Sequence, residues 1–216
     1  MQQRSLQLVE SLVEAAGRVV AEEGLAAVTT IRVAERAGVS VGSLYQYFEN
    51  KEALLGALVT RMNGELRRAV DAAAPQLVRA DPQAMVRGLL QVAFDFFGGR
   101  DGLHTELLRN WHRLDIQQGL HRFEQHMLEM MRMYALAHLR ELRLDPQPAQ
   151  GFIVINSVVF TLLRYLSLPR PALFTREQLV EELSRMIAGT MVPAAGPSTG
   201  RGRGRKGPPR GRTPKR

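Results

Sequence analysis

Apolar residues recur at intervals of three and four positions along most of this chain, as they do in helices that bury one face. Leu8, Leu12, Ala16 and Val19 begin this pattern. Alternation of apolar and polar residues, which is typical of a half-buried strand, is not convincing anywhere, and no internal repeat is present. The pattern predicts an all-α fold. We expect about nine helices, over residues 5–23, 29–37, 41–47, 51–73, 82–97, 103–114, 117–142, 147–168 and 176–191.

Short polar side chains stand at the start of several of these helices. Thr29, Ser40, Asn50 and Thr175 each precede a helical pattern. The side-chain oxygen of such a residue accepts a hydrogen bond from a free backbone amide in the first turn, so we expect these four residues to cap helices. Gly38 is expected to end the second helix, because glycine readily adopts the left-handed conformation in which many helices terminate.

The second and third predicted helices are joined by a glycine-valine-serine turn, and the third helix is short. A helix, a tight glycine turn and a short helix are typical of a helix-turn-helix, whose second helix enters the major groove of DNA. Gly42 and Ser43 let the backbone approach a phosphate, Tyr45 and Tyr47 offer hydroxyls, and Gln46 can present its amide to a base edge. An ordinary three-helix packing unit has the same spacing, so the pattern leaves this alternative open.

Three sequence blocks, TTIRVAERAGVS, GSLYQYF and NKEALL, follow one another in this region. Through them, residues 8–58 resemble the N-terminal domain of the TetR-like (tetracycline-repressor) family of bacterial regulators. The resemblance implies a DNA-binding domain over residues 1–50 and a ligand-binding and dimerisation domain over residues 51–192, with the helix at 51–73 as connector. It implies phosphate contacts by Thr29, Ser43, Tyr47 and Lys51, and contacts in or beside the groove by Arg32, Val41, Gly42, Tyr45 and Gln46.

The resemblance also implies a homodimer that pairs through the last two long helices. The apolar faces of the helices at 147–168 and 176–191 exceed what one small subunit needs to bury. The residues on these faces are Ile153, Val154, Ser157, Val158, Thr161, Leu179, Leu183, Met186 and Ile187. The alternative is that both faces serve the subunit core alone.

A row of methionines marks a candidate pocket for a small apolar or amphipathic ligand. Methionine side chains repack around varied apolar shapes, which suits loose selectivity, although a row at helical spacing is also typical of core packing. The candidate pocket residues are Trp111, His112, Met127, Met130, Met131, Tyr134, Phe152, Asn156 and Phe160.

The net charge of +8 is located in the last 24 residues, 193–216, which contain eight Lys or Arg and no acidic residue. The other 192 residues carry 21 basic and 21 acidic side chains. Because the tail is rich in Pro and Gly and has no large apolar side chain, we expect it to be disordered. The first 51 residues hold five basic and six acidic side chains, so the bulk charge does not reveal the basic face expected of a DNA-binding domain.

Several kinds of site have no support in the sequence. The chain contains no cysteine, which excludes disulfides, thiolate zinc sites and cysteine nucleophiles. His121 and His126 are five residues apart and so lie on different sides of a helix, and no nucleophile motif or phosphate loop is present. We therefore expect no catalytic residue, metal or cofactor. The N-terminus lacks the features of a signal peptide, and the apolar run at 152–163 is too short to span a bilayer, which predicts a buried helix in a cytoplasmic protein without a membrane partner.

Three functions are compatible with these features. The first, which we favour, is a homodimeric repressor that a small molecule releases from a palindromic operator in double-stranded DNA. The second is a ligand-independent DNA-organising protein whose basic tail dominates binding. The third treats the tail as a binder of RNA or a membrane surface and the helical body as its anchor.

Removal of the basic tail separates the first two functions. A chain that ends at Met191 should bind non-specific DNA more weakly, because each phosphate contact adds up to about 0.9 to the slope of log affinity against log salt. Binding titrations at several salt concentrations should give a shallower slope and an unchanged ranking of DNA sequences. Loss of that ranking in a chain that still folds would show that the helix-turn-helix does not read the sequence.

Overall fold

The computed structural model describes residues 2–99, 102–114, 117–138, 148–168 and 173–191, and within these ranges the chain is helical and contains no strand. The all-α prediction is therefore confirmed. The elements are α1 (Gln2–Glu23), η1 (Leu25–Ala27), α2 (Thr30–Ala37), α3 (Val41–Tyr45), α4 (Lys51–Leu77), α5 (Pro82–Phe97), α6 (Leu103–Arg109), η2 (Trp111–Arg113), α7 (Gln117–Ala137), α8 (Pro148–Ser167) and α9 (Arg176–Met191), where η marks a short 3₁₀ helix.

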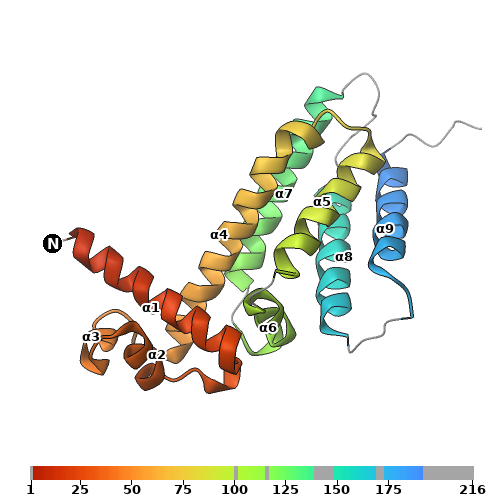
Figure 1. Ribbon diagram of the computed structural model, residues 1–216. Helices are drawn as coiled ribbons and strands as arrows, with labels where there is room; N and C mark the ends of the chain where they lie inside the picture. Colours follow the sequence, from red (N-terminus) through yellow and green to blue (C-terminus); the bar gives the residue numbers. More distant parts are fainter. Residues whose placement is uncertain (1, 100–101, 115–116, 139–147, 169–172, 192–216) are drawn as a thin grey trace, which may run out of the picture.

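The helices form two groups along the length of α4 (Figure 1). Helices α1, α2 and α3 gather at the beginning of α4, while α5 and α7 pack along its later turns, with α9 against α5 and α8 against α7. Helix α6 lies between the groups and contacts both α1 and α8. The predicted order of a small N-terminal unit followed by a larger helical unit is present in this arrangement.

The predicted helix caps are confirmed. Thr29, Ser40 and Asn50 accept hydrogen bonds from the amides of residues 32, 43 and 53 at 3.1, 3.0 and 2.8 Å. Thr175 accepts from the amide of residue 178 at 3.2 Å. Gly38 ends α2 with φ of 71°, in the left-handed region that only glycine adopts at little cost.

Several predicted helix boundaries are wrong. Helix α4 continues to Leu77 rather than 73, because Pro75 lies in its last turn, where the missing amide costs one hydrogen bond and does not stop the helix. Helix α3 ends at Tyr45 instead of 47. The helix expected over 103–114 divides at Asn110, whose ψ of 16° lies outside the helical range. The short helix η1 was not predicted, and the predicted helix ends at 139–142 and 147 lie outside the described residues.

The N-terminal core extends beyond residue 50. Leu12, Val33 and Leu44 from the first three helices pack with Leu54 and Leu58 of α4, and all five are at most 2% exposed. Leu107 of α6, which is 1% exposed, belongs to the same cluster. A boundary at residue 50 therefore cuts through a packed core.

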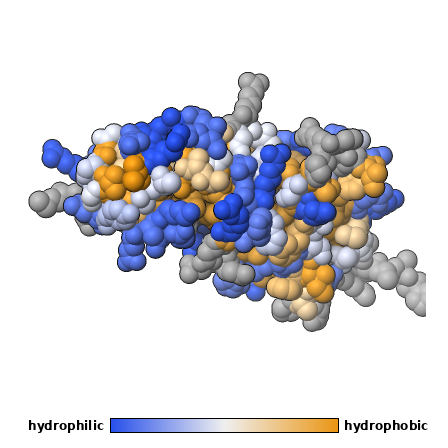
Figure 2. All heavy atoms as spheres, turned by 90° about the horizontal axis from the view of Figure 1, so that it is seen from below, coloured by the Kyte–Doolittle hydropathy of each residue, from blue (hydrophilic) through white to orange (hydrophobic). Residues whose placement is uncertain are grey.

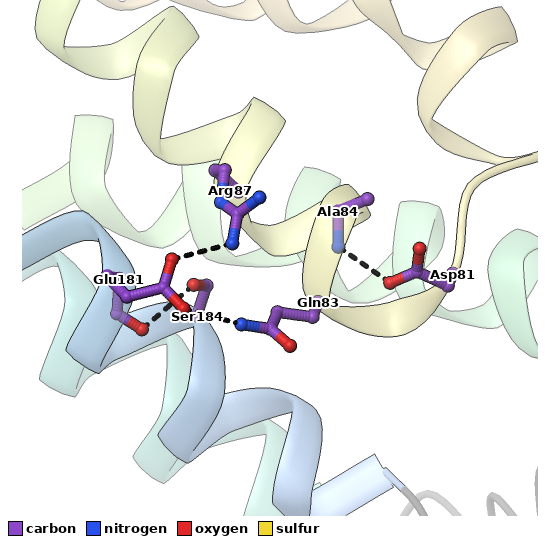
Figure 3. A network of polar contacts seen from close by, with 6 residues as sticks. All are labelled: Asp81, Gln83, Ala84, Arg87, Glu181 and Ser184. Carbon is purple, nitrogen blue, oxygen red and sulfur yellow. Dashed lines mark hydrogen bonds and ion pairs between the residues drawn. The ribbon is translucent and has the colours of Figure 1, made fainter. Parts of the chain in front are cut away.

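Helices α5 and α9 pack closely against each other (Figure 3). Ser184, which is fully buried, donates a hydrogen bond to the carbonyl oxygen of Glu181 at 3.0 Å, and its small side chain permits the close approach. At the surface, the Glu181 carboxylate accepts from Arg87 at 2.6 Å and from Gln83 at 2.9 Å. Because these groups are exposed, each contact adds little stability, and the buried apolar residues dominate the packing.

The residues of α9 that the sequence placed together on one apolar face for a dimer interface are divided in the structure between the subunit core and the surface. Leu183 and Ile187, expected at a dimer interface, are 6% and 3% exposed and belong to a core cluster with α5 and α8. Leu179 is also packed against that cluster. Met186, beside them on the helix, faces outward and is 57% exposed. For Leu183 and Ile187 the alternative of subunit-core packing is therefore correct, since α5 covers this face.

Helix α8 is less buried than the sequence predicted. Among the described residues it is the one helix that is long and apolar enough to cross a membrane by length and composition, but only 22% of Ala149–Ser167 is buried. The expected buried helix is therefore largely exposed in the single subunit, and it is longer than the apolar run at 152–163. A helix that packs against protein has the same length and composition, so this one helix does not indicate a membrane protein. Its outer face exposes Ile153 and Phe160 by 62% and 43%. Seen from below, apolar surface also appears at the end of the molecule away from α1–α3 (Figure 2).

Truncation of Leu183 tests its position in the core. Leu183→Ala should lower the free energy of unfolding by about 2–5 kcal/mol, because it removes a buried side chain and leaves a cavity. Leu136→Ala is the matched control, since Leu136 on α7 is 63% exposed, and it should change stability by at most about 0.5 kcal/mol. Denaturant titration measures both values; equal effects would contradict the assignment of Leu183 to the core.

Candidate nucleic-acid interface and ligand cavity

All nine residues predicted to contact DNA lie at the surface, on or next to α2, α3 and the start of α4. Seven are exposed, and Val41 and Ser43 are partly buried. Tyr45 and Tyr47 are 52% and 37% exposed, although aromatic residues of this size are usually more buried. The remaining exposed residues are Thr29, Arg32, Gly42, Gln46 and Lys51. The structure thus brings the predicted residues together on a surface, while their contacts with DNA stay a prediction.

Two hydrogen bonds hold Tyr45, the last residue of α3, and Tyr47, which follows the helix. The Tyr47 hydroxyl accepts from Ser5, near the start of α1, at 3.1 Å. The Tyr45 hydroxyl lies 3.2 Å from the hydroxyl of Thr30, the first residue of α2. Because Ser5 donates in the first pair, the phenolic proton of Tyr47 remains able to donate outward to an acceptor such as a phosphate.

Sequence reasoning missed Ser5 and Thr30. Ser5 is 42 residues from Tyr47, and nothing in the local pattern reveals which residues of α1 meet α3. Their pairing depends on how α1 lies across the helix-turn-helix, which only the tertiary structure defines.

Acidic residues of α1 neutralise the arginines of α2. Arg32 forms an ion pair with Glu23, and Arg36 forms one with Glu22. Since Arg32 and Arg36 are already paired, a phosphate would have to share the guanidinium with a carboxylate or replace that carboxylate. These ion pairs match the absence of net positive charge in a domain whose surface is predicted to contact DNA.

Helix α6 connects the helix-turn-helix to the rest of the molecule. Leu107 packs in the N-terminal core and also lines the large cavity of the second unit. The neighbouring Glu106 carboxylate accepts from the amide of Leu25 at 3.4 Å and from the Asn110 side chain at 2.9 Å. A shift of α6 would therefore change contacts in both units.

The cavity has a volume of about 190 Å³ and is lined by residues from α4 to α9 and from η2. Five of the predicted pocket residues line it: Trp111, Met127, Met130, Met131 and Tyr134. The other four predicted pocket residues do not line it.

Those four residues have other surroundings. His112 is exposed on η2 and Phe152 is 58% exposed on α8. Asn156 donates to the Glu124 carboxylate at 2.8 Å. The Phe160 ring contacts the Trp111 ring from outside the cavity, with centroids 6.0 Å apart. The sequence placed Phe152, Asn156 and Phe160 on the right helix but could not define the rotation of α8.

The described residues contain no group of three or more His, Cys, Asp or Glu side chains arranged to hold a metal ion. His126 instead lies 2.9 Å from the Asp71 carboxylate, between α7 and α4. His121 is 3.9 Å from Glu124 on its own helix.

Comparison with known proteins identifies relatives of this chain. Residues 12–58 match the family described as bacterial regulatory proteins, tetR family. The nucleoid occlusion factor SlmA of Glaesserella parasuis serovar 5 (strain SH0165) is 30% identical over 162 residues, which cover 71% of this chain and 77% of SlmA. The HTH-type transcriptional regulator BetI of Rhizobium meliloti (strain 1021) is 40% identical over 85 residues, which cover 39% of this chain and only 41% of BetI.

Solved structures share the fold. A TetR transcriptional regulator from Rhodococcus sp. RHA1 has a TM-score of 0.62 at 19% identity, with 87% of this chain and 97% of that chain covered. The multidrug binding protein EbrR complexed with malachite green has a TM-score of 0.59 at 22% identity, with 83% and 97% covered. At these identities the likeness establishes the fold alone.

The Ser5 hydroxyl should act on DNA binding through Tyr47. Ser5→Ala should weaken binding to all DNA sequences about 2- to 10-fold, because the Tyr47 hydroxyl loses the donor that orients it. In a Tyr47→Phe background the same change should have no further effect. Ser11→Ala is the matched control, since the Ser11 hydroxyl bonds only within α1, to the carbonyl of Gln7 at 2.9 Å. Binding titrations of this double-mutant cycle would reject the role if both backgrounds lose equal affinity.

Proposed function

This chain belongs to the tetR family of bacterial regulatory proteins and is a DNA-binding transcriptional regulator, and on that premise we propose that it is a homodimeric repressor which a small molecule releases from a palindromic operator. The observation that carries this proposal is the position of Leu107, which lines the cavity and also packs in the core of the helix-turn-helix. The proposal includes a cytoplasmic location.

Helix α4 is the proposed lever. It has 27 residues, which corresponds to a length of roughly 40 Å. Leu54 and Leu58, near its beginning, pack in the helix-turn-helix core. Met62 belongs to that core and also lines the cavity, and Leu66 and Val70 line the cavity further along the helix. A ligand that favours a different tilt of α4 would change the separation of the two recognition helices in the dimer. Coupling of about 1–3 kcal/mol would weaken operator binding roughly 5- to 150-fold.

The far end of α4 provides a fixed point for such a tilt. The Tyr134 hydroxyl of α7 donates to the carbonyl of Ala80 at 2.8 Å, and a ring nitrogen of His138 lies 2.8 Å from the carbonyl of Val78. These contacts hold the turn after α4 against α7. A displacement beside the cavity would then move the end of α4 that bears the helix-turn-helix.

On the DNA side, each residue has a proposed role. Gln46 offers its amide to a base edge, and Thr29, Ser43, Tyr47 and Lys51 hold phosphates. Arg32, Val41, Gly42 and Tyr45 face the groove or its edge. In a homodimer the two α3 helices enter successive major grooves, so half-site centres should lie about 34–36 Å apart or somewhat further.

The proposed dimer interface combines the outer faces of α8 and α9. Ile153, Ser157 and Met186 are exposed in the single subunit and form its central part. Thr161 is half-buried and lies at its edge, and Phe160 adds a further exposed aromatic ring. Leu183 and Ile187 are omitted because they are occupied inside the subunit. Exposed apolar side chains on adjacent helices support a protein partner for this face.

A second candidate is a ligand-independent DNA-organising protein. The observation in its favour is that the SlmA relative, matched over 77% of its length, is named a nucleoid occlusion factor. Under this function the basic residues at 193–216 dominate binding, and no small molecule changes the affinity for DNA. A flat preference across genomic fragments would favour it, whereas enrichment of a palindrome favours the repressor.

Substitution of Met186 tests the dimer. Met186→Arg should convert the dimer to a monomer, because it places an unpaired charge in an apolar interface, and binding to an operator selected from genomic fragments should weaken with it. Met133→Arg is the matched control, since Met133 on α7 is 55% exposed and lies outside the proposed interface. Sedimentation velocity gives the assembly state, and thermal denaturation checks the fold. A Met186→Arg chain that remains dimeric would place the interface elsewhere.

A further inference from the structure

The cavity is lined by side chains whose composition restricts its ligand to one chemical class. We propose that it takes an uncharged, largely hydrocarbon molecule of about the size of a substituted single ring, with one hydrogen-bonding group recognised by the Asn63 amide. This inference rests on the proposed ligand-responsive function and adds to it the class of ligand and the residue that selects it.

The cavity wall contains no charged side chain among the described residues. Its lining is made of aliphatic, methionine and aromatic side chains, with Asn63, Trp111 and Tyr134 as the residues that carry a polar side-chain group. A carboxylate or an ammonium group inside this wall would lose its hydration without gaining a counter-charge, which costs several kcal/mol. An anionic or cationic ligand is therefore disfavoured.

Of the three polar residues, Asn63 is the best anchor. The Tyr134 hydroxyl is engaged with the carbonyl of Ala80, and the Trp111 indole has a single N–H and accepts no hydrogen bond. Asn63 is half-buried and makes no hydrogen bond to another described residue, and its amide both donates and accepts. A ligand hydroxyl could therefore use either half of this group.

Gly119, at the start of α7, leaves the space that the Asn63 amide occupies. A Cβ atom at residue 119 would lie 3.2 Å from the Asn63 Cγ atom and closer still to its nitrogen, so a larger residue would displace the amide. Residue 119 is buried, and its lack of a side chain lets Asn63 occupy the space between α4 and α7.

The cavity volume limits the size of the ligand. A dry apolar cavity of about 150 Å³ binds benzene, so a volume of about 190 Å³ admits a benzene ring with a short alkyl group. A suitable series keeps the isopropylphenyl body constant and varies only the para group. Its members are 4-isopropylphenol, 4-isopropyltoluene, 4-isopropylbenzoate and 4-isopropylbenzylammonium.

Trp111 provides the readout, because it is the chain's single tryptophan and lines the cavity. In fluorescence titrations of the full chain near neutral pH, 4-isopropylphenol should bind saturably. The benzoate and the benzylammonium should bind at least about 100-fold more weakly. Asn63→Leu should lower affinity for the phenol about 2- to 10-fold and leave affinity for the toluene unchanged. Asn156→Leu, outside the cavity, should alter neither.

A second variant keeps the test decisive if Asn63→Leu does not fold. Asn63→Asp should shift preference toward the benzylammonium, because it supplies the missing counter-charge. Equal binding of charged and neutral probes by the unmodified chain, or equal loss of phenol and toluene affinity in Asn63→Leu, would overturn the inference.

Operator binding is measured separately with each probe. If the phenol binds but does not release the operator, the proposed repressor function is rejected and the ligand class stands. If only a charged probe releases the operator, the proposed ligand class is rejected and the repressor function stands.

Discussion

One continuous helix, α4, contributes side chains to both packed units of this protein, and the proposed regulation depends on that continuity. Leu58 is buried against the helix-turn-helix, and Leu66, two turns later, faces the cavity. A helix held by backbone hydrogen bonds along its length transmits a displacement rather than absorbing it. Leu107 of α6 provides a second connection, since the same side chain contributes to the first core and to the cavity wall. The cavity and the core of the helix-turn-helix thus share residues.

The DNA-binding surface gains little from net charge. The Arg32–Glu23 and Arg36–Glu22 ion pairs leave few unpaired basic groups near α3, and Lys51 lies 4.0 Å from Glu52. If this surface binds DNA as proposed, its affinity relies on positioned hydroxyls, amides and helix N-termini, whose effect depends on geometry. Positioned groups bind DNA only when they are correctly placed, so a motion that changes the spacing of the two recognition helices in the proposed dimer would weaken DNA binding.

Local sequence signals predicted the helical fold and the helix-turn-helix well, because caps such as Thr29 and turns such as Gly38 depend on neighbouring residues. Features set by tertiary packing could not be predicted. Leu183 and Met186 have similar character, and only the position of α5 decides which of them is buried. The same limit applies to the pocket. The methionine row that includes Met130 lines the cavity, but the rotation of α8 turns Phe160 away from the cavity. The contact between Ser5 and α3 left no local signal.

The separation of the two recognition helices in the proposed dimer tests the central claim most directly. The chain has no cysteine, so Glu35→Cys, at an exposed position on α2, gives one spin-label site per subunit. Distance distributions are measured with operator DNA and with a saturating cavity ligand. The account predicts two different distances, with the operator-bound value matching successive major grooves. An identical distribution in both states, for a ligand that occupies the cavity and releases the operator, would contradict the lever mechanism.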